Sequence, residues 1–209
     1  MIRVILASKS PARLATLRAA GIEPVVLDAG VDERAIDAPT TAELVAEISR
    51  HKGEAALAAV LATPALAPTP DNPVVLLAAD TMLDVDGTPE GKPGTPAVAR
   101  RRLAALSGTT QTLFTGHFVA LLQDGREPQI RRATAATTVR FATLDEAEMD
   151  AYAASGEPEQ VAGSFTIDAL GGPFIAGLDG DPHNVVGISL PLLRLLLRDL
   201  GVAWPSLWH

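Results

Sequence analysis

The order of apolar and polar residues at the start of the chain predicts strands that alternate with helices. An apolar run at residues 2–7 predicts a strand, and apolar residues then recur at helical spacing over residues 11–20. The run IEPVVLDAG predicts a second strand that ends near Gly30. This strand–helix–strand order is typical of an α/β fold.

The middle of the chain carries a long helix and the most apolar strand. The helix begins at Thr40 or Thr41 and ends near Thr63, and the proline-rich segment PALAPTPDNP after it predicts a surface connection. VVLLAADTMLDVDG then starts as a continuous apolar run, which is the pattern of a strand buried on both faces. Asp86 and Gly87 at its end predict a hairpin turn.

The second half of the chain predicts a hairpin between helices. The segment PFIAGLDGDPHNVVGISL predicts a further strand and a turn. Because helices interleave with strands at both ends of the chain, we expect an α/β fold with a mixed sheet and a ligand crevice near strand ends. The other predicted elements are helices over residues 95–108, 145–154 and 189–200 and strands over residues 110–122 and 129–141.

The composition limits the classes of partner. With 209 residues, of which 47% are hydrophobic, the chain can form one large domain or two joined lobes. A net charge of −8 argues against broad binding to nucleic acid or anionic membranes, although it allows one small anion in a locally basic pocket. The absence of cysteine excludes disulfides and thiol catalysis. Because the sequence has no signal-peptide pattern and no apolar run of membrane-spanning length, we expect a cytoplasmic protein without a membrane partner.

The junction between the first strand and the first helix is rich in hydroxyl and cationic side chains, namely Ser8, Lys9, Ser10 and Arg13. Ser10 can cap the helix, with Pro11 as its first residue. A helix N-terminus also binds anions, and cations in a first turn oppose the helix dipole unless an anion is present. Capping alone and anion binding both explain the pattern.

Asp80 ends the buried apolar run VVLLAAD and is followed by Thr81. A carboxylate at the mouth of a buried strand is a typical general base or metal ligand. The alternatives are an aspartate that caps a turn or pairs with an arginine. Lys92 follows in GTPEGKP, where it can reach a phosphate as a point charge or lie in solvent as an ordinary surface lysine.

Three further residues are candidates for the same site. Lys52 lies among small residues of the long helix, and Glu33 lies in an acidic loop; for each, simple solvation is the alternative. Asp168 lies in a glycine-rich loop, where it can accept the two N–H donors of a guanine edge or merely bond to nearby backbone. Cations, carboxylates suited to Mg²⁺ or Mn²⁺ and glycine-rich walls together fit a nucleotide triphosphate.

Long stretches of the sequence resemble the Maf family, the septum-formation-inhibitor-like nucleoside triphosphate pyrophosphatases. They include LASKSPAR, AADTMLDVDGTPEGKPGTPAVARRRLAALSG, TLFTGH and SGEPEQVAGSFTIDALGG, in the order of the family and over nearly the whole chain. The resemblance implies a single Maf-like domain over residues 1–209, with an elongated twisted mixed sheet, two lobes and a central cleft. It also implies cleavage of a nucleoside triphosphate to the monophosphate and pyrophosphate with Mg²⁺ or Mn²⁺.

The resemblance also implies a role for each candidate residue. Asp80 corresponds to the proton acceptor, Glu33 and Asp80 to acidic metal-binding positions, and Thr81 to the second residue of the Asp-Thr pair at the substrate site. The positions that handle the phosphates are Ser8, Ser10, Arg13, Lys52 and Lys92.

The loop before residue 172 departs from the pyrimidine-preferring branch of that family. Val161 replaces a lysine, Ser164 and Phe165 replace Ala-Tyr, and Asp168 replaces a glutamine. Ala-Gly-Ser-Phe and an acid at position 168 resemble the 7-methyl-GTP-preferring branch, which has the longer glutamate there. The base is left open, and a role in removing non-standard nucleotides is implied.

Two other functions remain as alternatives at this stage. The chain can be a nucleotide-binding regulator of septum formation with little turnover, or a metal-dependent phosphatase that releases orthophosphate. A homodimer is a further open point, because the final helix can close the core or supply a dimer surface; its amphipathic pattern favours burial within its own domain.

Overall fold

The structure is a computed structural model that describes residues 2–28 and 30–208. Within these residues, seven strands form one sheet in the order β2-β1-β3-β5-β6-β7, with β4 paired to β3. The strands are β1 (Arg3–Leu6), β2 (Val25–Val26), β3 (Val74–Val85), β4 (Thr88–Glu90), β5 (Thr110–Leu122), β6 (Gln129–Phe141) and β7 (Ile175–Asp179). The α-helices are α1 (Pro11–Ala19), α2 (Thr41–Ala62), α3 (Pro96–Leu106), α4 (Glu146–Ala154), α5 (Pro182–Val186) and α6 (Leu190–Asp199).

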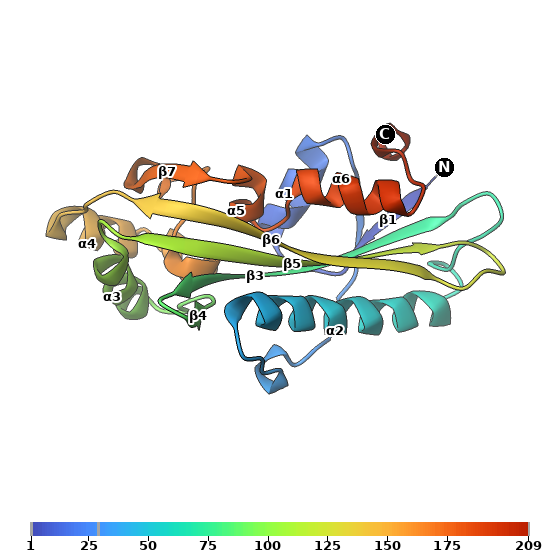
Figure 1. Cartoon of the computed structure of the whole chain (residues 1–209), viewed down its shortest axis with the longest axis horizontal. Helices are drawn as coiled ribbons and strands as arrows, with labels where there is room; N and C mark the ends of the chain where they lie inside the picture. The colour runs from blue at the N-terminus through green and yellow to red at the C-terminus, as the bar shows by residue number, and fades with distance from the viewer. Residues whose placement is uncertain (1, 29, 209) are drawn as a thin grey trace.

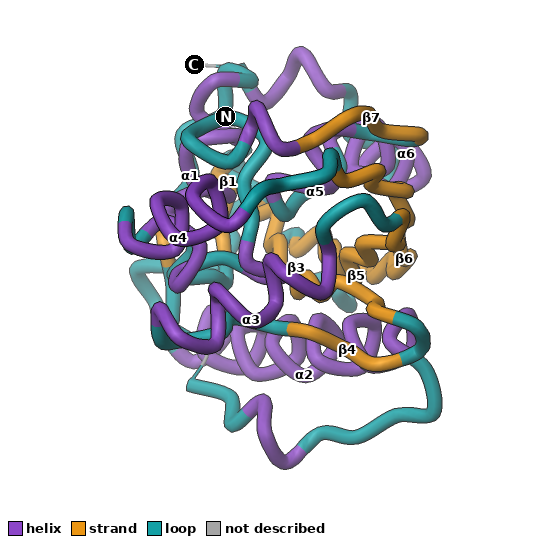
Figure 2. Tube along the Cα trace, turned by 90° about the vertical axis from the view of Figure 1, so that its left-hand side faces the viewer, coloured by secondary structure: helices purple, strands orange, loops and turns teal. Residues whose placement is uncertain are grey.

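The sheet separates two layers of helices. α2 lies along one face of the sheet, whereas α1 and α6 lie on the other (Figure 1). α3 and α4 gather at one end of the long strands, near β4. A view turned by 90° shows the same separation, with the strands between α2 and α6 (Figure 2). The predicted mixed α/β sheet flanked by helices is confirmed.

β1 is the strand at which the connections switch from one side of the sheet to the other. It pairs in parallel with β2 on one edge and with β3 on the other. The connection to β2 runs through α1 and the connection from β2 to β3 runs through α2, on opposite faces of the sheet (Figure 1). A crevice opens outside the carboxyl end of a strand in this position. β1 ends at Leu6 opposite Leu77 and β3 runs on beyond it, so Asp80 and Thr81 lie where this topology predicts a crevice.

Polar residues in the middle of the long strands divide the apolar core into two halves. On β3, residues 74–79 are buried in the half that contains β1, and apolar packing resumes at Leu83 in the half that contains α3 and β7. Asp80 lies between the two halves, opposite Gly116 of β5. The halves correspond to the two predicted lobes, and β3, β5 and β6 run through both (Figure 1).

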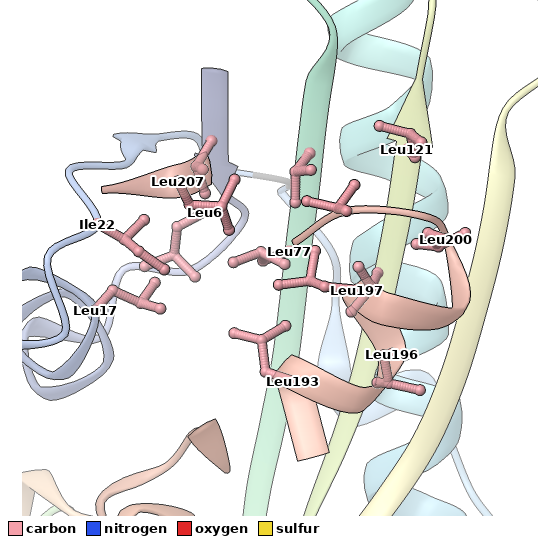
Figure 3. Packing of buried hydrophobic residues seen from close by; sticks show 14 of the residues in the cluster. Leu6, Leu17, Ile22, Leu77, Leu121, Leu193, Leu196, Leu197, Leu200 and Leu207 are labelled. Atoms are coloured by element: carbon pink, nitrogen blue, oxygen red, sulfur yellow. The ribbon is translucent and has the colours of Figure 1, made fainter. Parts of the chain in front are cut away.

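The apolar face of α6 closes the core of the lobe that contains β1. Leu193 and Leu197 point from α6 toward Leu77 on β3 and belong to the same buried cluster (Figure 3). The face is buried within the chain, as its amphipathic pattern predicts. In the described part of the chain no helix combines the length and the hydrophobicity needed to cross a membrane.

Capping residues set where the helices begin. Ser10 Oγ accepts a hydrogen bond from the backbone N–H of Arg13, and Thr40 Oγ1 accepts one from that of Glu43. α1 and α2 therefore begin where the sequence predicts. The predicted hairpin over residues 110–122 and 129–141 is also confirmed, with the same bounds.

Two expectations need correction. The second strand is only Val25–Val26 and does not extend toward Gly30, because its partner β1 ends at Leu6, which pairs with Val26. The turn predicted after β7 contains a short helix, α5. Asp181 starts this helix by accepting a hydrogen bond from the N–H of His183.

His117 connects β5 to the start of α6. Its ring is buried, with Nδ1 3.0 Å from the carbonyl oxygen of Thr115 and Nε2 2.9 Å from the backbone nitrogen of Ser189. Because the Ser189 N–H can only donate, Nε2 accepts and Nδ1 carries the proton. Burial lowers the pKa of His117 to about 4, although the Thr115 carbonyl acts in the opposite direction. The ring is therefore neutral at pH 7.

We expect the free energy of unfolding to fall as the pH decreases from 6.5 toward about 4. In the unfolded chain His117 takes up a proton near pH 6.5, whereas the folded ring does so only near pH 4. The loss is roughly 3 kcal/mol in total. Urea unfolding across this pH range measures the free energy of unfolding of the wild type, of His117→Gln and of the exposed control His51→Gln. An equal acid-induced loss in His117→Gln and the wild type would contradict the assignment.

Candidate active site

Arg13 of α1 joins three segments that are far apart in the sequence. Only 8% of the residue is exposed. Nη1 donates to Ser8 Oγ at 3.0 Å, Nη2 to Thr81 Oγ1 at 2.9 Å and Nε to the Gly187 carbonyl oxygen at 2.7 Å. Burial lowers the pKa of the guanidinium, and the nearby Asp80 carboxylate opposes this. Since an arginine stays protonated in proteins, a positive charge is fixed beside the crevice at the end of β1.

The side chain of Lys52 bridges two carboxylates. Its Nζ lies 2.7 Å from Asp80 Oδ1 on β3 and 2.7 Å from Glu33 Oε1. Glu33 belongs to the short 3₁₀ helix η1 (Glu33–Ala35) in the loop before α2. The side chain of Lys52 is only 13% exposed, so a purely solvated lysine is excluded. The side chain of Glu33 is more exposed, at 47%, but its ion pair with Lys52 shows that it is not simply solvated either.

Asp80 is buried with one oxygen engaged and the other without a partner. Oδ1 accepts from Lys52, whereas Oδ2 is buried and has no hydrogen-bond partner among the described residues. Burial raises the pKa of the Asp80 carboxyl, and the positive charges of Lys52 and Arg13 counteract this. A carboxylate with a free buried oxygen can accept a proton from water or bind a cation. Its ion-pair partner is a lysine and not the arginine considered from the sequence.

Two glycines allow α2 to bring Lys52 within reach of Asp80. A Cβ on Gly53 would lie 2.2 Å from an aromatic ring on β5, and a Cβ on Gly116 would lie 2.2 Å from the carbonyl oxygen of Val45 on α2. Gly116 pairs directly with Asp80 across β5 and β3. The helix backbone therefore rests on the sheet immediately next to the carboxylate.

The serines at the start of α1 are organised around Arg13. Ser8 Oγ accepts from the backbone N–H of Ser10 at 3.2 Å as well as from the guanidinium. Ser10 caps the helix, so the capping interpretation is confirmed. Lys9 instead turns away to pair with Asp28 at 2.6 Å, and its side chain is 74% exposed. Binding of an anion by Ser8 and Ser10 remains a prediction.

Lys92 does not join this cluster. It is exposed in the loop after β4, and it forms no ion pair with the described residues. The loop itself is anchored, because Arg102 of α3 donates to the Gly91 carbonyl oxygen at 2.7 Å and the Gly94 N–H donates to the Glu159 carbonyl oxygen at 3.3 Å. Lys92 is therefore a free cation on a fixed loop of the other lobe.

Asp168 also lies outside the ion-paired cluster. It is exposed and lines a groove of about 460 Å³ between α1, α5 and its own loop. Ala12 and Val186 line the same groove, and their chain neighbours Arg13 and Gly187 are joined by the hydrogen bond described above. The groove lies along the face of α1 that carries Ala12 and Thr16, and it is large enough for a small ligand.

The carboxylates at Lys52 are a suitable but incomplete metal site. Among the described residues no group of three or more acidic or histidine side chains could hold a metal ion. Asp80 Oδ2 is nevertheless unpartnered, and the Glu33 carboxylate is close by on the same lysine. Mg²⁺ is usually bound by one or two carboxylates together with substrate phosphates and water. The donors fit a hard cation that arrives with a triphosphate.

Two residues that support the site were given no role in the sequence analysis. Thr115 Oγ1 lies 3.0 Å from Thr81 Oγ1 and donates to the Asn184 carbonyl oxygen at 3.1 Å. The buried Asn184 amide donates to the Leu113 carbonyl oxygen. The sequence analysis gave only a family segment, TLFTGH, for Thr115 and a predicted turn for Asn184. The contacts join residues 34 to 71 positions apart and could not be inferred from either segment.

The chain is similar in sequence to known proteins. The family model described as "Maf-like protein" matches residues 3–200. Proteins named nucleoside triphosphate pyrophosphatase are similar over nearly their whole length: that of Cutibacterium acnes is 47% identical, covering 98% of this chain and 94% of its own, and that of Saccharopolyspora erythraea is 48% identical, covering 99% and 97%. A HAM1 protein from Coxiella burnetii has a TM-score of 0.37 and 17% identity, covering 69% of this chain and 75% of its own.

We expect Gly116→Ala to weaken both the fold and the site. The new methyl group would overlap the Val45 carbonyl and force α2 away from the sheet, which separates Lys52 from Asp80. Overpacking of this kind typically costs about 1–3 kcal/mol. Thermal unfolding measures the loss. Gly91→Ala is the matched control, because a Cβ there meets open space. Equal melting temperatures for the two variants would show that the close approach is not required.

Proposed function

The chain belongs to the Maf-like protein family, and from this premise we propose that it is a nucleoside triphosphate pyrophosphatase with a preference for 7-methyl-GTP. The reaction consumes one water and yields a nucleoside monophosphate and pyrophosphate. Similarity to proteins of that name over nearly their whole length supports the activity. One observation carries the mechanism: a buried carboxylate, Asp80, with a free oxygen beside two fixed cations.

The triphosphate would lie in the crevice at the end of β1. The N-terminus of α1 offers backbone N–H groups there, and the hydroxyls of Ser8 and Ser10 lie beside them. Arg13 supplies a buried positive charge from one side of β3 and Lys52 supplies another from α2. Lys92 would add a third charge from the second lobe once a phosphate chain spans the crevice.

Asp80 would act as the general base. Its free Oδ2 takes a proton from a water molecule that attacks the anhydride between the α- and β-phosphates, and pyrophosphate leaves. Lys52 holds the other oxygen, which fixes the direction of the carboxylate and favours its ionised form. Thr81 keeps Arg13 in place. Positioning and charge stabilisation supply most of the rate in such reactions.

Mg²⁺ or Mn²⁺ would be held by Asp80 and Glu33 together with the phosphates. A bound cation neutralises charge on the phosphate chain and polarises its oxygens. The chain's own part is to present the two carboxylates at a fixed separation through their shared contact with Lys52.

The base preference rests on Asp168 and the groove that it lines. The groove is lined by α1 and α5, the two helices between which Arg13 forms its hydrogen bond to Gly187, and the base would occupy it while the phosphates lie at the end of β1. A carboxylate accepts hydrogen bonds from the N1–H and N2–H donors of guanine, a pair that uracil and thymine lack. It also attracts the positive charge of a 7-methylated ring.

The first experiment is a product assay on a panel of 7-methyl-GTP, GTP, dTTP, UTP, CTP and ATP with Mg²⁺ or Mn²⁺, counting pyrophosphate and orthophosphate separately. We expect pyrophosphate, fastest from 7-methyl-GTP, and none after chelation of the metal. Faster release from pyrimidines would overturn the role of Asp168 and leave the enzyme class intact. Orthophosphate as the product would indicate a phosphatase, and no product would favour a binding role.

Replacement of Asp80 tests its role as the general base. Asp80→Asn keeps the shape of the side chain but cannot take a proton, so kcat should fall by about 10²–10⁴-fold. In the wild type kcat should decline as the pH falls through the raised pKa of Asp80, because the protonated acid is inactive. Binding of a non-hydrolysable α,β-methylene triphosphate controls for intact structure. Near-full kcat in a folded Asn variant would exclude Asp80 as the base.

A further inference from the structure

The carboxylate of Glu157 is the centre of a hydrogen-bond network in the second lobe. Glu157 begins the short 3₁₀ helix η2 (Glu157–Gln160), which follows α4. Its Oε1 accepts from the Tyr152 hydroxyl at 3.0 Å, from Thr166 Oγ1 at 2.6 Å and from the Gly171 N–H at 3.0 Å, and its Oε2 accepts from the Leu170 N–H at 3.1 Å. Four donors from two segments of the chain therefore converge on one side chain.

These bonds bracket the loop that carries Asp168. Thr166 lies two positions before Asp168, and Leu170 lies two positions after it. The Tyr152 hydroxyl, held by Glu157, also accepts from the Thr166 N–H at 3.1 Å. Both ends of the loop are thus fixed to the same carboxylate, while its tip is free to face the groove.

The tip of the loop has little packing of its own. Asp168 and its two following residues are exposed, and Leu170 is 61% exposed although it is apolar. Ile167 alone packs against the nearby apolar cluster. With so little apolar burial, the hydrogen bonds to Glu157 are the main restraint on where Asp168 sits.

The network requires a close approach of backbone to side chain. A Cβ on Gly171 would lie 2.4 Å from the Tyr152 hydroxyl and 2.8 Å from the Thr166 nitrogen. The loop therefore closes tightly around this hydroxyl. Partial burial acts to raise the pKa of the Glu157 carboxyl, but the hydrogen bonds that it accepts outweigh this and hold that pKa below its usual value. Burial raises the pKa of Tyr152 to about 12, so its hydroxyl remains a donor.

We propose that Glu157 is a positioning residue for base selection: by holding both ends of the 166–171 loop, it sets where Asp168 meets the base. This inference rests on the proposed function and deepens it. Among the described residues Glu157 forms no hydrogen bond or ion pair with the cluster around Asp80, and its effect is on which nucleotide is chosen, not on the cleavage step.

Glu157→Gln tests the inference with the smallest change in shape. A glutamine has one acceptor oxygen, and its NH₂ group would face at least one of the four donors in either orientation. Selectivity is the kcat/KM for the best nucleotide of the panel divided by the kcat/KM for the poorest one. We expect this ratio to fall about tenfold, mainly because the KM for the best nucleotide rises. Kinetics are measured on 7-methyl-GTP and UTP, with thermal unfolding alongside.

Glu159→Gln is the matched control, because it removes the same charge from the same short helix. In the described part of the chain the Glu159 side chain makes no hydrogen bond or ion pair, and only its backbone carbonyl is engaged. The control should keep the wild-type ratio. Tyr152→Phe removes only the hydroxyl and should shift the ratio in the same direction by less, which provides a second variant if Glu157→Gln does not fold.

The outcomes separate the inference from the proposed function. Unchanged selectivity in Glu157→Gln, or an equal loss of kcat on every nucleotide, overturns the inference and leaves the pyrophosphatase intact, because a merely structural role lowers the active fraction for all substrates alike. A wild type that releases pyrophosphate without discriminating between bases also overturns the inference. A wild type that releases none overturns the proposed function itself.

Discussion

The buried ion pair between Lys52 and Asp80 is the constraint on which the arrangement of the site depends. An unpaired carboxylate at this depth would cost several kcal/mol or would take up a proton. The pair forms only because the backbone of α2 rests on β5 at Gly53 and Gly116, so the lysine starts close to the sheet. A helix one side chain further away would remove the Lys52 charge that counteracts the effect of burial on the pKa of Asp80. The two glycines are thus part of the site, although neither touches a ligand.

The fold can hold this polar pair because apolar packing lies on both sides of it. β3 is buried among apolar residues before Asp80 and again from Leu83 onward. The long strands run through both lobes, so the two apolar cores hold the polar middle in addition to its own contacts. Arg13 adds a second restraint, since its three hydrogen bonds join the start of α1, β3 and the end of α5. The elements around the end of β1 are therefore joined to one another by buried hydrogen bonds.

The sequence predicts those features that depend on neighbouring residues. The hairpin over residues 110–122 and 129–141 follows from its apolar runs, and the start of α1 follows from Ser10 and Pro11. What it does not predict are contacts between distant segments. The family resemblance places Lys52, Glu33 and Asp80 in one site, but only the folded chain shows that the lysine bridges the two carboxylates. The predicted length of β2 is wrong for the same reason, because the end of β1 sets how far β2 can pair.

The arrangement separates two tasks. The groups proposed for cleavage lie on β3, on α2 and at the start of α1, where packing and buried hydrogen bonds fix them. Asp168 lies on an exposed loop whose position depends on one carboxylate, that of Glu157. If Asp168 selects the base as proposed, a change in the loop alters which base is accepted at little cost to the buried pair, because no hydrogen bond among the described residues joins the loop to that pair. Glycine at position 171 keeps that loop closed, since any side chain there would strike the Tyr152 hydroxyl.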